Sequence, residues 1–138
     1  MKFFLSMTPP TATAQERKVA VVHGVPRFYD PKPVQAARAL LMAHLRQHVP
    51  AEPLSGPLEL RAVWRFPCGR AHRDGEWRVT RPDTDNLQKL LKDCMTRCGF
   101  WHDDAQVVRE TVEKRWASEP AGIEIEIAPP DNAEEVVK

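Results

Sequence analysis

The sequence has few cysteines and no long apolar run. Its three cysteines cannot all pair with one another, and Cys94 and Cys98 lie four residues apart in a helical pattern. This usage favours reduced thiols over a disulfide scaffold. The apolar run from Phe3 to Met7 is too short for the core of a signal peptide, and no other stretch approaches membrane-spanning length. These absences predict a soluble, cytoplasmic protein.

The charges lack a dominant sign. Twenty Lys and Arg residues stand against 19 Asp and Glu residues, a formal net charge of +1. The overall charge therefore neither requires nor excludes a polyanionic partner. A length of 138 residues fits one domain. We expect this domain to occupy residues 1–128 and to be followed by a polar tail at residues 129–138.

Hydrophobic periodicity predicts an α+β fold. The segments Lys32–His48 and Asp85–Cys98 carry apolar residues at helical spacing, and Gly99 suits the left-handed cap of the second helix. From Leu58 to Phe66, apolar and polar residues alternate, as in a strand with one buried face. We therefore expect a small mixed or antiparallel sheet packed against these two helices.

Shorter patterns predict further strands. Lys2–Met7 and Val19–Val22 can each form a short strand. Near the C-terminus, apolar residues alternate with charged ones in Val108–Trp116 and again in Ile123–Ile127. A turn sequence, Pro120–Gly122, separates these two runs. This arrangement predicts an antiparallel hairpin.

Two pairs of aspartates flank the second helix. Asp83 and Asp85 stand at its start, and Asp103 and Asp104 follow its end. Helix capping and turn formation are common uses of such residues. At about 100° per residue, Asp85 and Lys89 share the face opposite the leucines. Whether Asp104 reaches the helix start depends on the register of the following strand, which the sequence leaves open.

Two segments resemble the signature blocks of the RusA family of Holliday-junction resolvases, which are crossover junction endodeoxyribonucleases. Residues 81–89, RPDTDNLQK, are similar to its Asp-x-Asp-Asn-Leu-x-Lys block. Residues 98–108, CGFWHDDAQVV, are similar to its (Phe/Trp)-x-Asp-Asp-x-Gln-Val block. The spacing between the blocks also resembles that of the family. The resemblance extends through Ile127 and is looser upstream of Arg81.

The resemblance implies a metal-dependent endonuclease with a RusA-like fold that takes part in DNA recombination and repair. By it, Asp83, Asp85 and Asp104 bind Mg²⁺, with Mn²⁺ as a substitute, and Lys89 is a further catalytic residue. Carboxylate oxygens are the hard ligands that Mg²⁺ prefers. The resemblance also implies a homodimer that acts on branched DNA. A four-way junction has approximate twofold symmetry, which a symmetric dimer matches.

A basic loop precedes the first aspartate. Residues 67–82 contain Gly69 and Gly75, and a loop of this length usually binds a ligand or lacks order. Its position predicts that four of its arginines hold DNA phosphates around the scissile bond. These are Arg70, Arg73, Arg78 and Arg81. Trp77 in the same loop is a candidate wedge at a junction.

Other interpretations remain open. A non-catalytic DNA-binding protein on the same fold would use the aspartates as caps and turns. An acidic-cluster nuclease could cut flaps, ordinary duplex or RNA, because cleavage machinery does not reveal substrate shape. A zinc site is disfavoured, because two of the candidate ligands continue the leucine stripe and no paired Cys-x2-Cys motif exists. The candidates are Cys68, His72, Cys94, Cys98 and His102.

Overall fold

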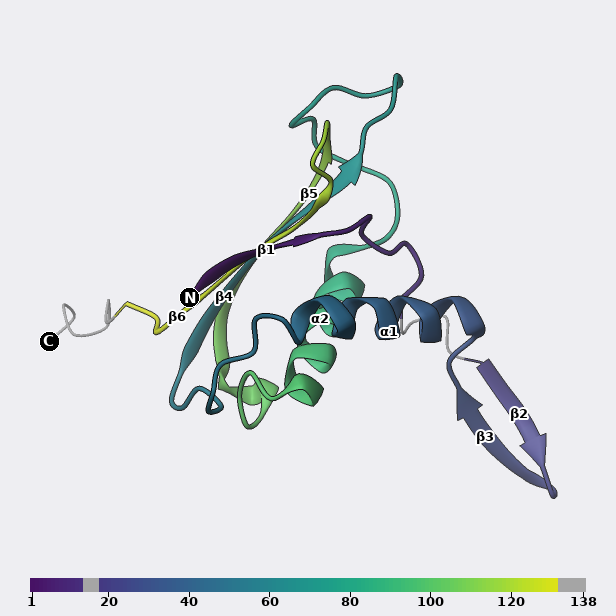
Figure 1. The fold of residues 1–138 in the computed structure, drawn as a ribbon. Helices are drawn as coiled ribbons and strands as arrows, with labels where there is room; N and C mark the ends of the chain where they lie inside the picture. The colour runs from purple at the N-terminus through teal and green to yellow at the C-terminus, as the bar shows by residue number, and fades with distance from the viewer. Residues whose placement is uncertain (14–17, 132–138) are drawn as a thin grey trace, which may run out of the picture.

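The computed structural model describes residues 1–13 and 18–131. They form a four-stranded mixed sheet, two helices on one of its faces and a separate two-stranded hairpin (Figure 1). This confirms the predicted α+β class. The elements are β1 (Lys2–Ser6), β2 (Lys18–Val22), β3 (Val25–Tyr29), α1 (Lys32–Leu45), β4 (Leu58–Pro67), α2 (Thr84–Cys98), the 3-10 helix η2 (Asp104–Gln106), β5 (Val107–Ala117) and β6 (Gly122–Ala128).

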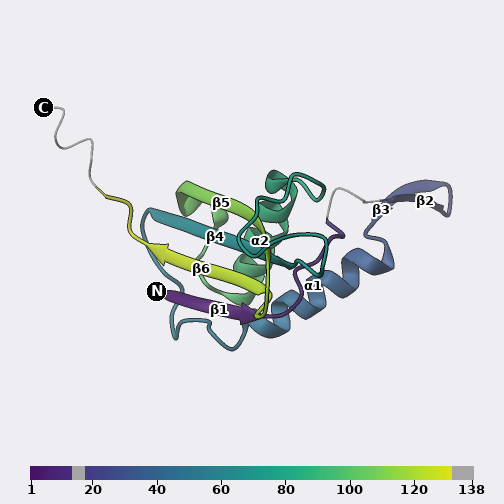
Figure 2. The same cartoon turned by 90° about the horizontal axis from the view of Figure 1, so that it is seen from above.

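The strand order in the main sheet is β1-β6-β4-β5 (Figure 2). β6 is antiparallel to β1 and to β4, whereas β5 is parallel to β4. The predicted hairpin between the last two strands is therefore wrong, because β4 lies between them. The crossover through α2 places β5 beside β4 in the parallel direction. The strand that follows then fills the position between β4 and β1.

The core lies between the sheet and the helices. The predicted alternation of β4 is confirmed, since Leu60, Trp64 and Phe66 are buried against the helices. The stripe of α2 is also buried, and Gly99 ends this helix with a φ of 93°, as predicted. The buried residues of α2 are Leu87, Gln88, Leu90, Leu91, Cys94 and Met95. The face of α2 opposite this stripe is thereby left for other functions.

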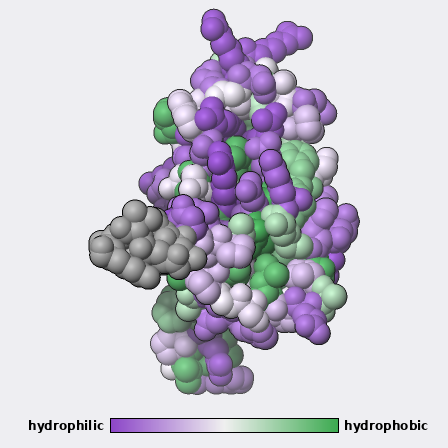
Figure 3. Space-filling model, turned by 90° about the vertical axis from the view of Figure 1, so that its left-hand side faces the viewer, coloured by the Kyte–Doolittle hydropathy of each residue, from purple (hydrophilic) through white to green (hydrophobic). Residues whose placement is uncertain are grey.

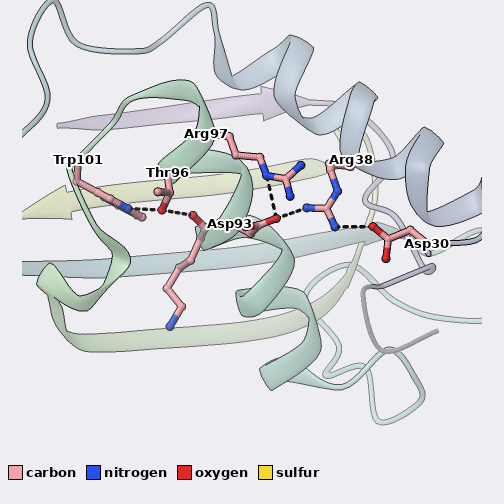
Figure 4. A network of polar contacts seen from close by, with 7 residues as sticks. Asp30, Arg38, Asp93, Thr96, Arg97 and Trp101 are labelled. Carbon is pink, nitrogen blue, oxygen red and sulfur yellow. Dashed lines mark hydrogen bonds and ion pairs between the residues drawn. The ribbon is translucent and has the colours of Figure 1, made fainter. Parts of the chain in front are cut away.

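A buried arginine clamps α1 to α2. Arg38 donates hydrogen bonds to Asp30, at 3.1 Å, and to Asp93 of α2, which also pairs with Arg97 at 3.4 Å (Figure 4). Burial alone would lower the pKa of Arg38, but the hydrogen bond to Asp30 and the charge of Asp93 outweigh it and raise this pKa. The clamp fixes α2 to the body of the protein.

The β2–β3 hairpin projects from the start of α1 (Figure 1). The predicted strand at 19–22 is confirmed, whereas β3 was not predicted. Its strands are largely exposed, with Val21 at 71% and Phe28 at 76% of their full accessibility. Of the predicted tail, residues 132–138 lie outside the described residues. No helix in the described ranges is long and apolar enough to cross a membrane.

Candidate active site

Asp83 is the N-cap residue of α2, and Asp85 lies in the first turn. The Asp83 backbone is extended, with φ −76° and ψ 152°, and its carbonyl oxygen accepts the N–H of Leu87 at 3.1 Å. Among the described residues, however, its carboxylate makes no capping hydrogen bond. Both aspartates are exposed. Their carboxylates are therefore available to a ligand, at a helix end that favours negative charge.

Residues 68–82, which we call the strap, are ordered along the outer edge of β5. The N–H of Gly75 donates to the carbonyl oxygen of Trp116 at 2.8 Å. The N–H of Trp116 donates to the carbonyl oxygen of Glu76, also at 2.8 Å. The N–H of Arg78 donates to the carbonyl of Lys114 at 3.0 Å. The predicted loop thus extends the sheet beyond the C-terminal half of β5.

Lys114 links the strap to the aspartates. Its ammonium group donates to the carbonyls of Thr80 and Pro82, each at 2.8 Å. Because Pro82 directly precedes Asp83, the position of this aspartate depends on β5 as well as on α2. Sequence reasoning missed Lys114. Its role follows from the pairing of strap and strand, for which the sequence carries no local signal.

The four arginines that were predicted to bind DNA differ in their surroundings. The guanidinium of Arg78 lies 4.2 Å from the ring centre of Phe66 and 4.5 Å from that of Trp116, and burial lowers its pKa. This arginine stabilises the strap. The other three side chains are exposed: Arg70, Arg73 and Arg81. Figure 3 shows hydrophilic side chains at the upper end of the molecule, where Figure 1 draws the strap.

The two aspartates beyond α2 have different roles. Asp103 caps η2, since its carboxylate accepts the N–H of Ala105 at 2.9 Å. In the reciprocal contact, the Gln106 side chain accepts the N–H of Asp103 at 3.0 Å. Asp104 is exposed and takes no part in this capping box. Of this pair, Asp104 is the residue left for a ligand.

One chain does not bring Asp104 to Asp83 and Asp85. They lie at opposite ends of α2 (Figure 1), which spans 15 residues, a separation of about 20 Å. β5 starts at the far end because it is parallel to β4. In the described ranges, no group of three His, Cys, Asp or Glu side chains is placed to hold a metal ion.

Lys89 is exposed, one turn after Asp85. Lys92 lies on the same helix face and pairs with Glu110 of β5 at 3.1 Å. This contact shows that the face with Asp85 and Lys89 is turned toward β5, which is one of the two edge strands of the sheet. Asp85 and Lys89 are therefore the predicted residues that the structure brings together on one surface.

Three of the cysteine and histidine side chains considered as zinc ligands pack against other residues: Cys94, Cys98 and His72. Burial raises the pKa of Cys94 to about 12 and also raises the pKa of Cys98. The ring of His72 stacks on Trp116 at 4.0 Å, and its Nδ1 lies 2.8 Å from Glu76. These side chains have structural roles.

Comparison with known proteins identifies the class. A family model described as endodeoxyribonuclease RusA matches residues 8–128. The chain belongs to this family. A crossover junction endodeoxyribonuclease of Lactococcus phage r1t is 31% identical over 128 residues, which cover 91% of this chain and 95% of that protein. The crossover junction endodeoxyribonuclease RusA of Escherichia coli K12 is 44% identical over 74 residues, which cover 54% of this chain and 53% of that protein.

Proposed function

We propose that this protein is a Mg²⁺-dependent, structure-specific DNA endonuclease. It acts in the cytoplasm in DNA recombination and repair, and resolves Holliday junctions by paired cuts. Membership of the RusA family supports the nuclease activity. The observation that carries the assignment of the site is that the carboxylates of Asp83, Asp85 and Asp104 serve no cap in the described part of the chain.

Asp83 and Asp85 would hold one side of the metal ion. Their exposed carboxylates suit Mg²⁺, and Mn²⁺ can take its place. The bound ion would supply a Lewis acid that lowers the pKa of the attacking water and offsets charge on the phosphate. Lys89, on the same face, adds positive charge beside that phosphate. We expect Lys89→Ala to lower turnover more than junction binding, and unchanged turnover would remove Lys89 from the mechanism.

Asp104 of a second copy would complete the site in a homodimer. β5 is an edge strand of the sheet, and on the side facing away from β4 no strand of the described residues neighbours its N-terminal half. Antiparallel pairing of two β5 strands about a twofold axis would lay the two α2 helices side by side in opposite directions. The start of each helix would then lie beside the end of its partner. This arrangement supplies the third carboxylate that one chain lacks.

A mixture of two inactive variants tests this shared site. Asp83→Asn and Asp104→Asn should each abolish cleavage alone. In a heterodimer of the two, one site carries both changes and the other carries none. Random exchange therefore restores about a quarter of the sites. We expect the mixture to nick four-way junctions in one strand. A site within one chain predicts no recovery, because every site then carries one change.

The matched control mixes Asp83→Asn with Asp85→Asn. Both changes lie at the same end of α2, so every site stays impaired, and recovery would contradict the shared site. Mn²⁺ binding, followed by electron paramagnetic resonance, gives a readout that is independent of turnover. Binding should return in the first mixture and stay weak in the control.

Substrate selectivity needs a direct comparison. Four-way junction, flap, linear duplex and RNA are incubated with the protein, with and without Mg²⁺. We expect paired symmetric nicks in the junction that depend on Mg²⁺. Preferred cleavage of flaps would assign a different branched substrate. Binding without cleavage under all conditions would indicate a non-catalytic DNA-binding protein.

A further inference from the structure

We propose that Trp77 is a stacking platform for an unpaired nucleobase at the branch point of the DNA. This inference rests on the proposed nuclease function and adds a contact that recognises the branch. Trp77 lies in the strap, between the exposed Arg73 and the exposed Arg81. Trp77 as a residue is 56% exposed, whereas Trp64 and Trp101 are buried in the core.

Contacts within the protein cover only part of the Trp77 ring. The guanidinium of Arg115 lies 3.6 Å from the ring centre. Arg115 is itself fixed, since it donates to Glu113 and to the carbonyl of Gly75, both at 2.9 Å. An indole supported in this way is stabilised by a cation–π interaction. Packing does not account for the exposed part of the ring, which can accept a flat partner.

Trp77 is held rigidly, and β5 positions both this residue and the proposed active site. Trp77 forms a β-bridge with Arg115, and both of its neighbours in the strap are hydrogen-bonded to β5. Lys114 of the same strand also holds the carbonyl that precedes Asp83. A preorganised aromatic ring loses little entropy on binding. A base stacked on Trp77 would therefore be held at a fixed position relative to the carboxylates.

The chemistry of the strap favours DNA as the ligand. Its exposed guanidinium groups, on Arg70, Arg73 and Arg81, provide cations for phosphates, and an aromatic ring accepts any unpaired base. A continuous duplex hides the faces of its bases, whereas bases unpaired at a branch expose them. The combination would therefore distinguish branched from linear DNA without reading sequence. The rival occupant is a second copy of this chain, with Trp77 at the dimer interface.

Binding measurements on Trp77 variants test the proposal. The variants are made in an Asp83→Asn background, which prevents cleavage, and binding to a four-way junction and to a linear duplex is followed by fluorescence anisotropy. We expect Trp77→Ala to weaken junction binding about tenfold and to leave duplex binding unchanged. Trp77→Phe should retain most of the affinity because it keeps an aromatic face. Val79→Ala is the matched control, since Val79 is 89% exposed on the same strap.

A second readout follows the base itself. With 2-aminopurine at the branch point, binding of the Asp83→Asn protein should quench its fluorescence, and Trp77→Ala should remove the quenching. Trp77→Leu keeps apolar volume without an aromatic face, and it replaces the alanine variant if that variant unfolds.

Three outcomes would overturn the platform. They are unchanged junction affinity, equal losses on junction and duplex, and dissociation of the Trp77→Ala protein into monomers in sedimentation. Two further results separate a failure of the stacking role from a failure of the proposed nuclease function. If the Asp83→Asn protein itself binds no junction, the proposed resolvase function fails. If the unmodified protein cuts junctions while Trp77→Ala behaves like its parent, only the stacking role fails.

Discussion

The two ends of α2 use their aspartates differently. At the C-terminal end, the capping box of η2 occupies the Asp103 carboxylate, and Asp104 beside it stays in solvent. At the N-terminal end, Asp83 holds the cap position but does not use its carboxylate as a cap, and Asp85 is also exposed. A structural aspartate and a candidate ligand can therefore be sequence neighbours with identical side chains, and only their hydrogen bonds distinguish them.

Removing a ligand charge should have the largest effect. We expect Asp83→Asn, Asp85→Asn and Asp104→Asn each to lower single-turnover cleavage of a junction by at least about 100-fold. Asp103→Asn should keep nearly full activity, because Asn caps a helix as well as Asp does. Junction binding by anisotropy and thermal melting serve as controls. Similar activity in Asp103→Asn and Asp104→Asn would contradict the assignment of Asp103 as a structural cap and of Asp104 as a metal ligand.

The arginines of the strap should show a similar division. Arg78→Ala should lower the free energy of unfolding by about 1–2 kcal/mol, because its guanidinium stacks on two rings. The double variant Arg70→Ala/Arg73→Ala should change stability by less than about 0.5 kcal/mol. Its junction binding should instead show a salt dependence that is shallower by about two in the log–log slope. Urea unfolding and salt titrations measure these quantities, and a destabilised double variant would contradict the division.

Asp103 should matter more than Asp104 for stability, whereas Asp104 should matter more for activity. Asp103→Ala loses the hydrogen bond to the N–H of Ala105 and should cost about 1 kcal/mol. Asp104→Ala should change the free energy of unfolding by less than about 0.5 kcal/mol. Chemical denaturation of both variants under identical conditions provides the measurement. Equal destabilisation would mean that Asp104 also has a structural role.

The smallest effect concerns the strap at acid pH. Hydrogen bonds from Ser118 lower the pKa of Asp74, and the N–H of Arg73 together with His72 lowers that of Glu76. Their ordinary values are 3.8 and 4.5. Since both pKa values are depressed, the stabilisation is present above the ordinary values and is lost as pH falls through the lowered ones. Asp74→Asn/Glu76→Gln should melt slightly earlier than wild type at pH 7, with no difference at the lowest pH. A constant difference would exclude the carboxylate charges.

The sequence predicted the elements better than their pairing. Both main helices and the alternation of β4 came from periodicity, which depends on which face of each element is buried. The turn sequence before Gly122 does not indicate whether the next strand pairs with β5 or with a different strand. The hairpin prediction failed for that reason. Strand order depends on the crossover through α2, which is a long-range property.

The candidate site was predictable only as a set of residues. The two signature blocks pointed to Asp83, Asp85 and Asp104, but the spacing between them could not show that a parallel β5 places them at opposite ends of α2. The strap was predicted as a loop of four similar arginines. Its pairing with β5 gave Arg78 a structural role, which depends on Phe66 and Trp116, residues distant in the sequence.

The position of β6 has a consequence for synthesis. This strand follows all the others in the described chain, yet it lies between β1 and β4. At its first residue, a Cβ on Gly122 would lie 2.2 Å from the carbonyl oxygen of Leu5, so glycine allows the two backbones to meet. On the ribosome, the sheet therefore cannot close until β6 has emerged. Until then the facing edges of β1 and β4 stay unpaired, and unpaired strand edges favour aggregation. An active nuclease forms only after synthesis of the domain is complete.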